Sequence, residues 1–309
     1  MRRSNLFLTA RKSCILVPMS NRATDLRAMA RYGSVRRRVC RLAAALLLAV
    51  LLPPAALAEE PKLAQPVAPP EGHPLSELFS GYRFQPEYVR EMQNEDIKNP
   101  GTLWRDYGRQ LWAQPAGAAE KSCADCHNVA EKAMQGVGAR YPKFLPPEGK
   151  PITLSERINL CRTLNMKAKP WPLGSDAMVA MTTYVRAQSR GVPMRVKTDG
   201  PAEPFFEAGR DYFYTPRGET GLSCAACHER DAGKKLDAAT LSQGHSNGFP
   251  AYKIAAERVE PLHRQFQRCN KRVGAEPLPL GADPYVNLEL YLAWRGIGLP
   301  VETPAVRNW

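Results

Sequence analysis

The chain has 309 residues, with 43 Lys and Arg against 30 Asp and Glu and a formal net charge of +13. A hydrophobic fraction of 44%, with 5 Trp and 11 Tyr, excludes a disordered chain and a multi-span membrane protein. Residues 1–58 hold 11 of the 43 basic side chains and one of the 30 acidic ones, which leaves 32 and 29 in residues 59–309, a net charge of +3. Nucleic acid is therefore not an expected partner.

Residues 1–58 have the pattern of an export leader. Four arginines within 36–41 precede an uncharged run rich in Leu and Ala at 42–52. This run has the length of a signal-peptide apolar region and is too short to span a bilayer core, which takes about 20 residues. Ala56-Leu57-Ala58 offers small residues where a signal peptidase needs them. We expect cleavage after Ala58 and a periplasmic protein without stable membrane insertion; an uncleaved anchor is the alternative.

Two copies of one short motif follow, CADCH at 123–127 and CAACH at 224–228. C-x-x-C-H is the attachment signature of c-type haem. Two thiols about one helical turn apart reach the two vinyl groups of a porphyrin, and the adjacent imidazole binds the iron. The residues expected to hold two covalent haem groups are Cys123, Cys126 and His127 in the first copy and Cys224, Cys227 and His228 in the second.

Three other interpretations of the motifs are weaker. A four-cysteine zinc site uses knuckles about 15–20 residues apart, whereas Cys126 and Cys224 are separated by 98 positions. A thioredoxin-like pair needs a βαβ setting, and no Val/Ile-rich strand precedes either motif. Plain disulfides are compatible with an exported protein, but two C-x-x-C-H copies behind a leader favour haem.

The motifs lie in matching contexts, which predicts a duplicated cytochrome unit. Gly108 lies 15 residues before the first motif and Gly209 lies 15 before the second. The runs 178–190 and 287–295 have the pattern of closing amphipathic helices with glycine stops. The predicted fold is all-α and loop-rich, with two tandem class I cytochrome c-like domains. The expected boundaries are a leader at 1–58, an extended segment at 59–100, domain 1 at 101–197 and domain 2 at 198–309.

The ligand on the far side of each iron is predicted from the inventory of side chains. The last methionine is Met194, so the second haem has only His245, His263 and Cys269 downstream of its motif. The first half offers several methionines and Cys161. Cys161 and Cys269 each follow a leucine by seven residues, with basic residues between. We expect His/Cys ligation of both irons; a Cys161–Cys269 disulfide or two core thiols are the alternatives. His245 is expected to be solvated in a Gly/Ser/Asn loop, and His263 is expected either at the surface or in contact with substrate.

The sequence resembles the SoxA family, the dihaem cytochrome c subunit of the bacterial sulfur-oxidation system. The resemblance rests on GRDYFYTPRG at 209–218, LSCAACH at 222–228, GFPAY at 248–252, RCN at 268–270 and LELYLAWR at 288–295, with the tail at 298–306. It covers most of 80–309 and is densest in the second half.

The resemblance implies an L-cysteine S-thiosulfotransferase. In that family thiosulfate is joined oxidatively to a cysteine of the SoxYZ carrier, a monohaem SoxX cytochrome completes the heterodimer, and electrons leave through haem. The distal cysteine of the second haem is the active-site residue, often a persulfide, and here it is Cys269. The first haem, with Cys161, is implied to be a structural or relay group. A pure dihaem electron carrier and a dihaem peroxidase are the competing functions, and a zinc module is a third.

The substrate-binding cation is the point where the sequence departs from the family pattern. The family places an arginine one turn before the distal cysteine, but Gln265 stands four positions before Cys269. Arg264 and Arg268 lie five positions and one position before it. We expect Arg264 to bind the sulfonate, with Arg268 as the second choice and a solvated helix charge as the alternative for Arg264.

Overall fold

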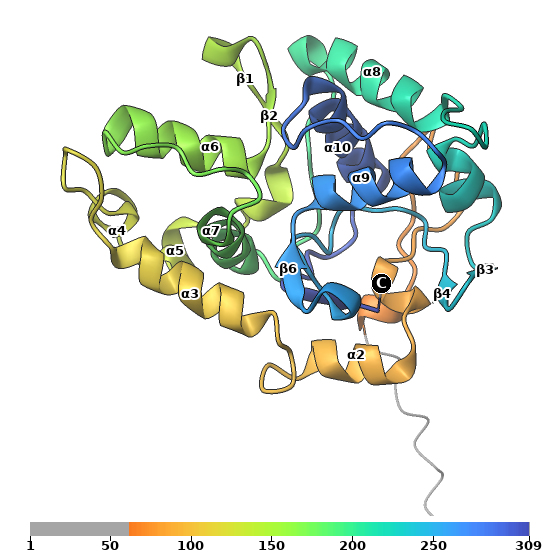
Figure 1. Ribbon diagram of the computed structural model, residues 1–309, viewed down its shortest axis with the longest axis horizontal. Helices are drawn as coiled ribbons and strands as arrows, with labels where there is room; N and C mark the ends of the chain where they lie inside the picture. Colours follow the sequence, from red (N-terminus) through yellow and green to blue (C-terminus); the bar gives the residue numbers. More distant parts are fainter. Residues whose placement is uncertain (1–61, 309) are drawn as a thin grey trace, which may run out of the picture. The chain divides into compact units, whose positions relative to one another are not determined.

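Two helix pairs organise the structure, a computed structural model that describes residues 62–308 (Figure 1). The predicted leader lies outside the described residues. Helix α3 (Thr102–Ala113) packs against α7 (Asp176–Ala187), and α8 (Glu203–Tyr214) packs against α10 (Asp283–Arg295). The closing helices at 178–190 and 287–295 therefore form, and both begin earlier than their apolar patterns predict, because Ser175 caps α7 and a Pro lies in the first turn of α10.

Each helix pair crosses at a glycine. A Cβ on Gly108 would lie 2.2 Å from the carbonyl oxygen of Ala180, and a Cβ on Gly209 would lie 2.0 Å from that of Asn287. No side chain fits between backbones at such distances. The two glycines found from sequence at equal spacing before the motifs are thus the contact points of equivalent helix pairs.

Between its two helices, each half carries a haem motif, a hairpin and a further helix. In the first half these are α4 (Cys123–His127), β1 (Lys143–Leu145), β2 (Lys150–Ile152) and α6 (Leu154–Leu160). In the second half they are a π-helical turn η7 (Ala226–Arg230), β5 (Ala251–Lys253), β6 (Arg258–Glu260) and α9 (Leu262–Arg272). Phe144 pairs with Pro151 in the first hairpin, and Tyr252 pairs with Val259 in the second.

The prediction of an all-α fold is wrong in part, because residues 62–308, although rich in helix, also contain three small sheets. The third is β3 (Lys235–Leu236) with β4 (Ala239–Thr240), and β7 (Ala305–Arg307) adds a parallel strand to β5. These strands have two or three residues each, too few for a period-two pattern to be recognised in sequence.

The remaining short elements connect these parts. They are α5 (Ala130–Ala133), a π-helical turn η5 (Cys161–Asn165), and the 3₁₀ turns η1 (Lys62–Ala64), η2 (Gly81–Phe84), η3 (Gly138–Arg140), η4 (Pro146–Glu148), η6 (Gly200–Ala202) and η8 (Ile254–Ala256). Among the described residues, none of the helices has both the length and the apolar character needed to cross a membrane.

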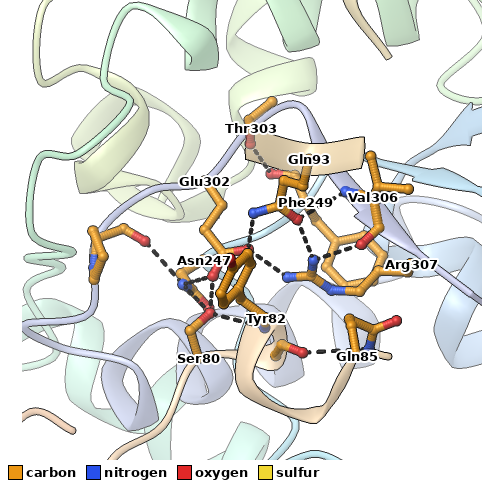
Figure 2. A network of polar contacts seen from close by, with 12 residues as sticks. Ser80, Tyr82, Gln85, Gln93, Asn247, Phe249, Glu302, Thr303, Val306 and Arg307 are labelled. Atoms are coloured by element: carbon orange, nitrogen blue, oxygen red, sulfur yellow. Dashed lines mark hydrogen bonds and ion pairs between the residues drawn. The ribbon is translucent and has the colours of Figure 1, made fainter. Parts of the chain in front are cut away.

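The segment expected to be extended, 59–100, contains a helix and contacts the C-terminal tail. Helix α2 (Glu87–Asn94) packs against β7. Gln93 of α2 donates to the buried carboxylate of Glu302 at 3.1 Å, and the Arg307 guanidinium reaches the same oxygen at 2.6 Å. Ser80 also donates to Glu302, so both ends of the described chain meet in one buried polar network (Figure 2).

Each half has its own core, and a third cluster joins them. Trp112, Met181 and Tyr184 belong to the first core, and Phe213 and Tyr291 belong to the second. A third cluster of buried residues mixes the two halves: Ala139, Met194, Val196, Leu290, Ala293 and Val301. Through this shared core the two halves form one compact unit within the described residues.

Candidate functional site

The second motif holds its histidine in a fixed orientation. The Nδ1 of His228 donates to the Ser242 carbonyl oxygen at 2.8 Å. The opposite nitrogen, Nε2, is the atom that remains for a metal. Gly244 lies against the ring, where an added Cβ would come within 3.0 Å of the His228 Cγ. The loop that follows the motif therefore accommodates the imidazole only because residue 244 is glycine.

Cys269 faces this histidine from helix α9. Leu262, Phe266 and Asn270 bury one side of the helix in the core, which places Cys269 at the edge of that side. Burial by itself raises the pKa of the Cys269 thiol, but the hydrogen bond and charge of His228 outweigh it and lower the pKa. Burial by itself would lower the pKa of His228, but the hydrogen bond and charge of Cys269 outweigh burial, so the pKa of His228 is raised.

The two porphyrin-attaching thiols of the second motif lie beside the same pair. Burial raises the pKa of Cys224 to about 11, and the charge of Cys269 contributes in the same direction. Burial also raises the pKa of Cys227, again with a contribution from Cys269. The structure thus brings together the four residues that the sequence assigns to the second haem.

The first motif has the same composition in a more open setting. Ser122 and Asp125 form a capping box that starts α4 at Cys123. His127 is exposed, and its ring centre lies 5.9 Å from that of Trp112. Burial raises the pKa of Cys123 to about 11, and Cys161, at the start of η5, adds to the effect.

The donor set at the second motif fits haem c. Two thiols one turn apart stand beside an imidazole oriented through its Nδ1, and a third thiol, that of Cys269, faces that imidazole. Haem iron takes axial His and Cys ligands of this kind. Within residues 62–308, no cluster of three or more His, Cys, Asp or Glu side chains is arranged to chelate a bare metal ion. The zinc interpretation therefore has no support in the described part of the chain.

Both remaining histidine candidates are buried, so the predictions of a solvated His245 and of a surface position for His263 are wrong. The Nδ1 of His263 accepts from the Gly281 N–H at 3.0 Å, and its Nε2 lies 3.0 Å from Glu289. His245 is 7% exposed and lies 3.1 Å from the Gln243 amide oxygen. Cys161 and Cys269 are both free thiols, so the structure contains no disulfide between them.

The two candidate arginines lie one turn apart on the same face of α9 and line one surface pocket, but their hydrogen-bond partners differ. Arg264 donates to Gln267 at 3.0 Å on the outer side of the helix. Arg268 donates to the Gln265 amide oxygen at 3.2 Å, and the Gln265 amide nitrogen lies 3.6 Å from the Cys269 sulfur. Arg268 is therefore linked to the thiol through one side chain. Which of the two binds substrate stays a prediction.

Sequence reasoning missed Lys253 as a residue of this region. It is 3% exposed, and its ammonium lies 5.0 Å from the centre of the Phe249 ring. A lone lysine 16 positions before the cysteine carries no sequence signal, because only the β5–β6 hairpin returns it to α9.

Comparison with known proteins places this geometry in one family. The family model described as SoxA/TsdA, cytochrome c domain, matches residues 107–194 and 208–301. An L-cysteine S-thiosulfotransferase subunit SoxA from Pseudaminobacter salicylatoxidans is 40% identical over 78% of this chain and 85% of its own length. The protein of the same name from Rhodovulum sulfidophilum is 39% identical over 76% and 82%.

A solved structure shows the same likeness in three dimensions. The crystal structure of SoxXA from P. pantotrophus matches with a TM-score of 0.73 and 36% sequence identity, covering 76% of this chain and 88% of that one. Because the match spans both haem motifs and most of the length of the relatives, the chain belongs to the SoxA family of cytochrome c proteins.

Proposed function

We propose that this protein is the thiosulfate-activating cytochrome subunit of an L-cysteine S-thiosulfotransferase. It joins thiosulfate to a cysteine thiol of a SoxYZ carrier and works with a SoxX-type monohaem cytochrome. The observation that carries the proposal is Cys269, a thiol of lowered pKa that faces His228 in the second C-x-x-C-H unit. The relatives from P. salicylatoxidans and R. sulfidophilum support the same activity, because both bear the name of a thiosulfotransferase subunit and not that of an electron carrier or a peroxidase.

The proposal includes two haem c groups and export to the periplasm. Two complete C-x-x-C-H motifs, each with a thiol in electrostatic reach, support the number of haem groups. The apolar run at 42–52 and Ala56-Leu57-Ala58 support export with cleavage after Ala58. Haem c, when bound, supplies an acceptor that takes up electrons one at a time.

The chemistry assigned to Cys269 balances as an oxidation followed by a transfer. The Cys269 thiolate and the sulfane sulfur of thiosulfate form a disulfide bond, giving Cys269–S–S–SO₃⁻, and two electrons leave. The thiolate of the carrier then attacks the sulfane sulfur, which releases the Cys269 thiolate and yields carrier–S–S–SO₃⁻. The first step depends on an ionised thiol, and the lowered pKa of Cys269 favours that state.

The equivalent cysteine of the first half, Cys161, provides a matched control for the role assigned to Cys269. We expect Cys269→Ala to abolish conjugation of thiosulfate to the carrier, and Cys161→Ala to keep most of it, with the partner cytochrome present in both assays. The mass of the carrier measures the product directly. Undiminished conjugation by Cys269→Ala would overturn the assignment, and equal losses in the two variants would point to haem loading rather than sulfur chemistry.

A further inference from the structure

A buried ion pair lies next to the histidine of the second motif. Glu229 follows His228 in the turn η7, and Arg295, the last residue of α10, contacts its carboxylate through Nη1 at 3.0 Å. The Arg295 side chain is 0% exposed. Tyr214, the last residue of α8, donates to the same carboxylate at 2.9 Å. The pair therefore connects both helices of the second crossing to the turn that carries His228.

The Arg295 guanidinium lies among aromatic rings and uses few of its hydrogen-bond donors. Its central carbon lies 4.5 Å from the centre of the Phe213 ring and 5.8 Å from that of Tyr291. Its Nε and Nη2 have no hydrogen-bond partner among the described residues. A buried cation with unpartnered donors costs free energy that a neutral side chain does not. Stability alone therefore does not explain an arginine at this position.

The first half has neutral residues at the two equivalent positions. Gln188 corresponds to Arg295, since each lies eight residues after the carbonyl that faces the crossing glycine of its helix pair. Asn128 corresponds to Glu229, since each follows the histidine of its motif. The Gln188 amide donates to the Tyr184 carbonyl oxygen of α7 at 2.8 Å. The same helix crossing thus forms without the ion pair, so the pair is not a requirement of this backbone plan.

The charge of Arg295 acts on the imidazoles around it. Burial, followed by this charge, lowers the pKa of His245. At His228, burial and the Arg295 charge both act to lower the pKa, although the hydrogen bond and charge of Cys269 outweigh them. The Glu229 side chain is 25% exposed, whereas the guanidinium is fully buried. Because water screens an exposed charge more strongly than a buried one, the positive member of the pair dominates at His228.

We propose that the Glu229–Arg295 pair raises the reduction potential of the haem at the second motif, with Arg295 as the acting charge and Glu229 as the residue that positions it. A cation beside the iron-binding imidazole favours reduced iron, which carries one positive charge less. The Cys269 thiolate works the other way, because negative sulfur stabilises oxidised iron. The buried guanidinium offsets part of that effect and keeps this haem able to accept electrons from sulfur. This inference rests on the haem c that the proposed function assigns to the second motif.

The neutral residues of the first half supply the test. The double variant Glu229→Asn, Arg295→Gln introduces them into the second half, and Arg295→Gln alone leaves the carboxylate without its cation. Arg295→Lys keeps the charge without the planar guanidinium. Arg230→Gln is the control, because it removes a cation from the same turn, but Arg230 is exposed and pairs with Asp231 at 2.8 Å. Each variant is compared as holoprotein, after haem absorbance and thermal unfolding have verified haem ligation and fold.

Redox titration of the haem absorbance, without thiosulfate or carrier, measures the potential of the second haem, with the first haem as the internal reference. We expect this potential to fall in Arg295→Gln, to fall less in the double variant because a negative charge is removed as well, and to stay near its original value in Arg295→Lys and in Arg230→Gln.

A pair with a purely structural role would lower the unfolding temperature of Arg295→Gln without moving the potential, and that result overturns the inference. A fall that Arg295→Lys does not reverse, or an equal fall in Arg230→Gln, overturns it too. The potential is measured without turnover, so a failure of thiosulfate conjugation leaves this test intact. A second motif that carries no haem would contradict the proposed function and this inference together.

Discussion

At the residue scale, burial favours the neutral form of two histidines, His245 in the second half and His73 in the N-terminal segment. Burial lowers the pKa of His245 well below its usual value, and the charges of Arg295, His73 and His228 act in the same direction. Burial, followed by Arg295, also lowers the pKa of His73. The Nε2 of His73 lies 3.1 Å from the backbone carbonyl oxygen of Arg295, so this contact connects the N-terminal segment to α10 in the folded chain.

These lowered pKa values predict a loss of stability in mild acid. Below about pH 6.5 the unfolded chain takes up protons at both histidines that the folded chain does not, so the free energy of unfolding falls as the pH falls. The slope for each histidine is at most about 1.4 kcal/mol per pH unit. Thermal unfolding of the holoprotein between pH 5 and pH 8 measures it. His245→Asn should flatten the slope below pH 6.5, and an unchanged slope in this variant would rule out His245 as the source.

The side chains that we propose to ligate or attach haem could be predicted from the sequence, whereas those around them could not. A C-x-x-C-H motif is local, so Cys224, Cys227 and His228 are visible without the fold. The thiol of Cys269 was found by its repetition in the two halves. The β5–β6 hairpin brings Lys253 back to α9. His245 is buried against Gly296, which directly follows α10. Contacts of that kind depend on packing between distant segments, which no local pattern encodes.

At the scale of elements, the helix crossings carry the duplicated fold. The backbone of α8 passes so close to that of α10 at Gly209 that an added Cβ would meet the Asn287 carbonyl. The first pair repeats this at Gly108. Equal spacing of the two glycines before the motifs therefore encoded a tertiary contact, which is why the helix pairs were predictable.

Filling one crossing should weaken the protein. We expect Gly209→Ala to lower the free energy of unfolding by about 1–3 kcal/mol, the usual cost of overpacking. Denaturant unfolding of the holoprotein measures the change. Arg210→Ala is the control on the same helix, since Arg210 is exposed and its ion pair with Glu207 is worth at most about 1 kcal/mol. Equal effects of the two substitutions would contradict the crossing as described.

The hairpins and the π-helical turns are the elements that sequence reasoning did not anticipate. The strands β1 and β2 contain three residues each, and β2 includes Pro151. The turn η7 carries His228 itself and continues from the motif without a proline or glycine to mark it. Elements this short depend on the tertiary packing around them and not on their own propensity.

At the scale of the whole molecule, the two cytochrome-like halves are built into one unit. The third core cluster mixes residues of both, and the network around Glu302 joins the N-terminal segment to the C-terminal tail. The duplication was predictable because it repeats in sequence at regular spacing. The union of the halves was not, since Ala139, Met194 and Leu290 are ordinary apolar residues until the fold brings them together.

We propose that Cys269, and not its counterpart Cys161, carries the sulfur of thiosulfate during the reaction. Peptide mass spectrometry of the holoprotein, after incubation with thiosulfate and oxidised partner cytochrome but without carrier, tests it most directly. We expect the Cys269 peptide to gain the mass of one thiosulfate and the Cys161 peptide to stay unmodified, and we expect added carrier thiol to remove the adduct. An adduct on Cys161, or an unmodified Cys269 in a preparation that conjugates the carrier at full rate, would contradict it.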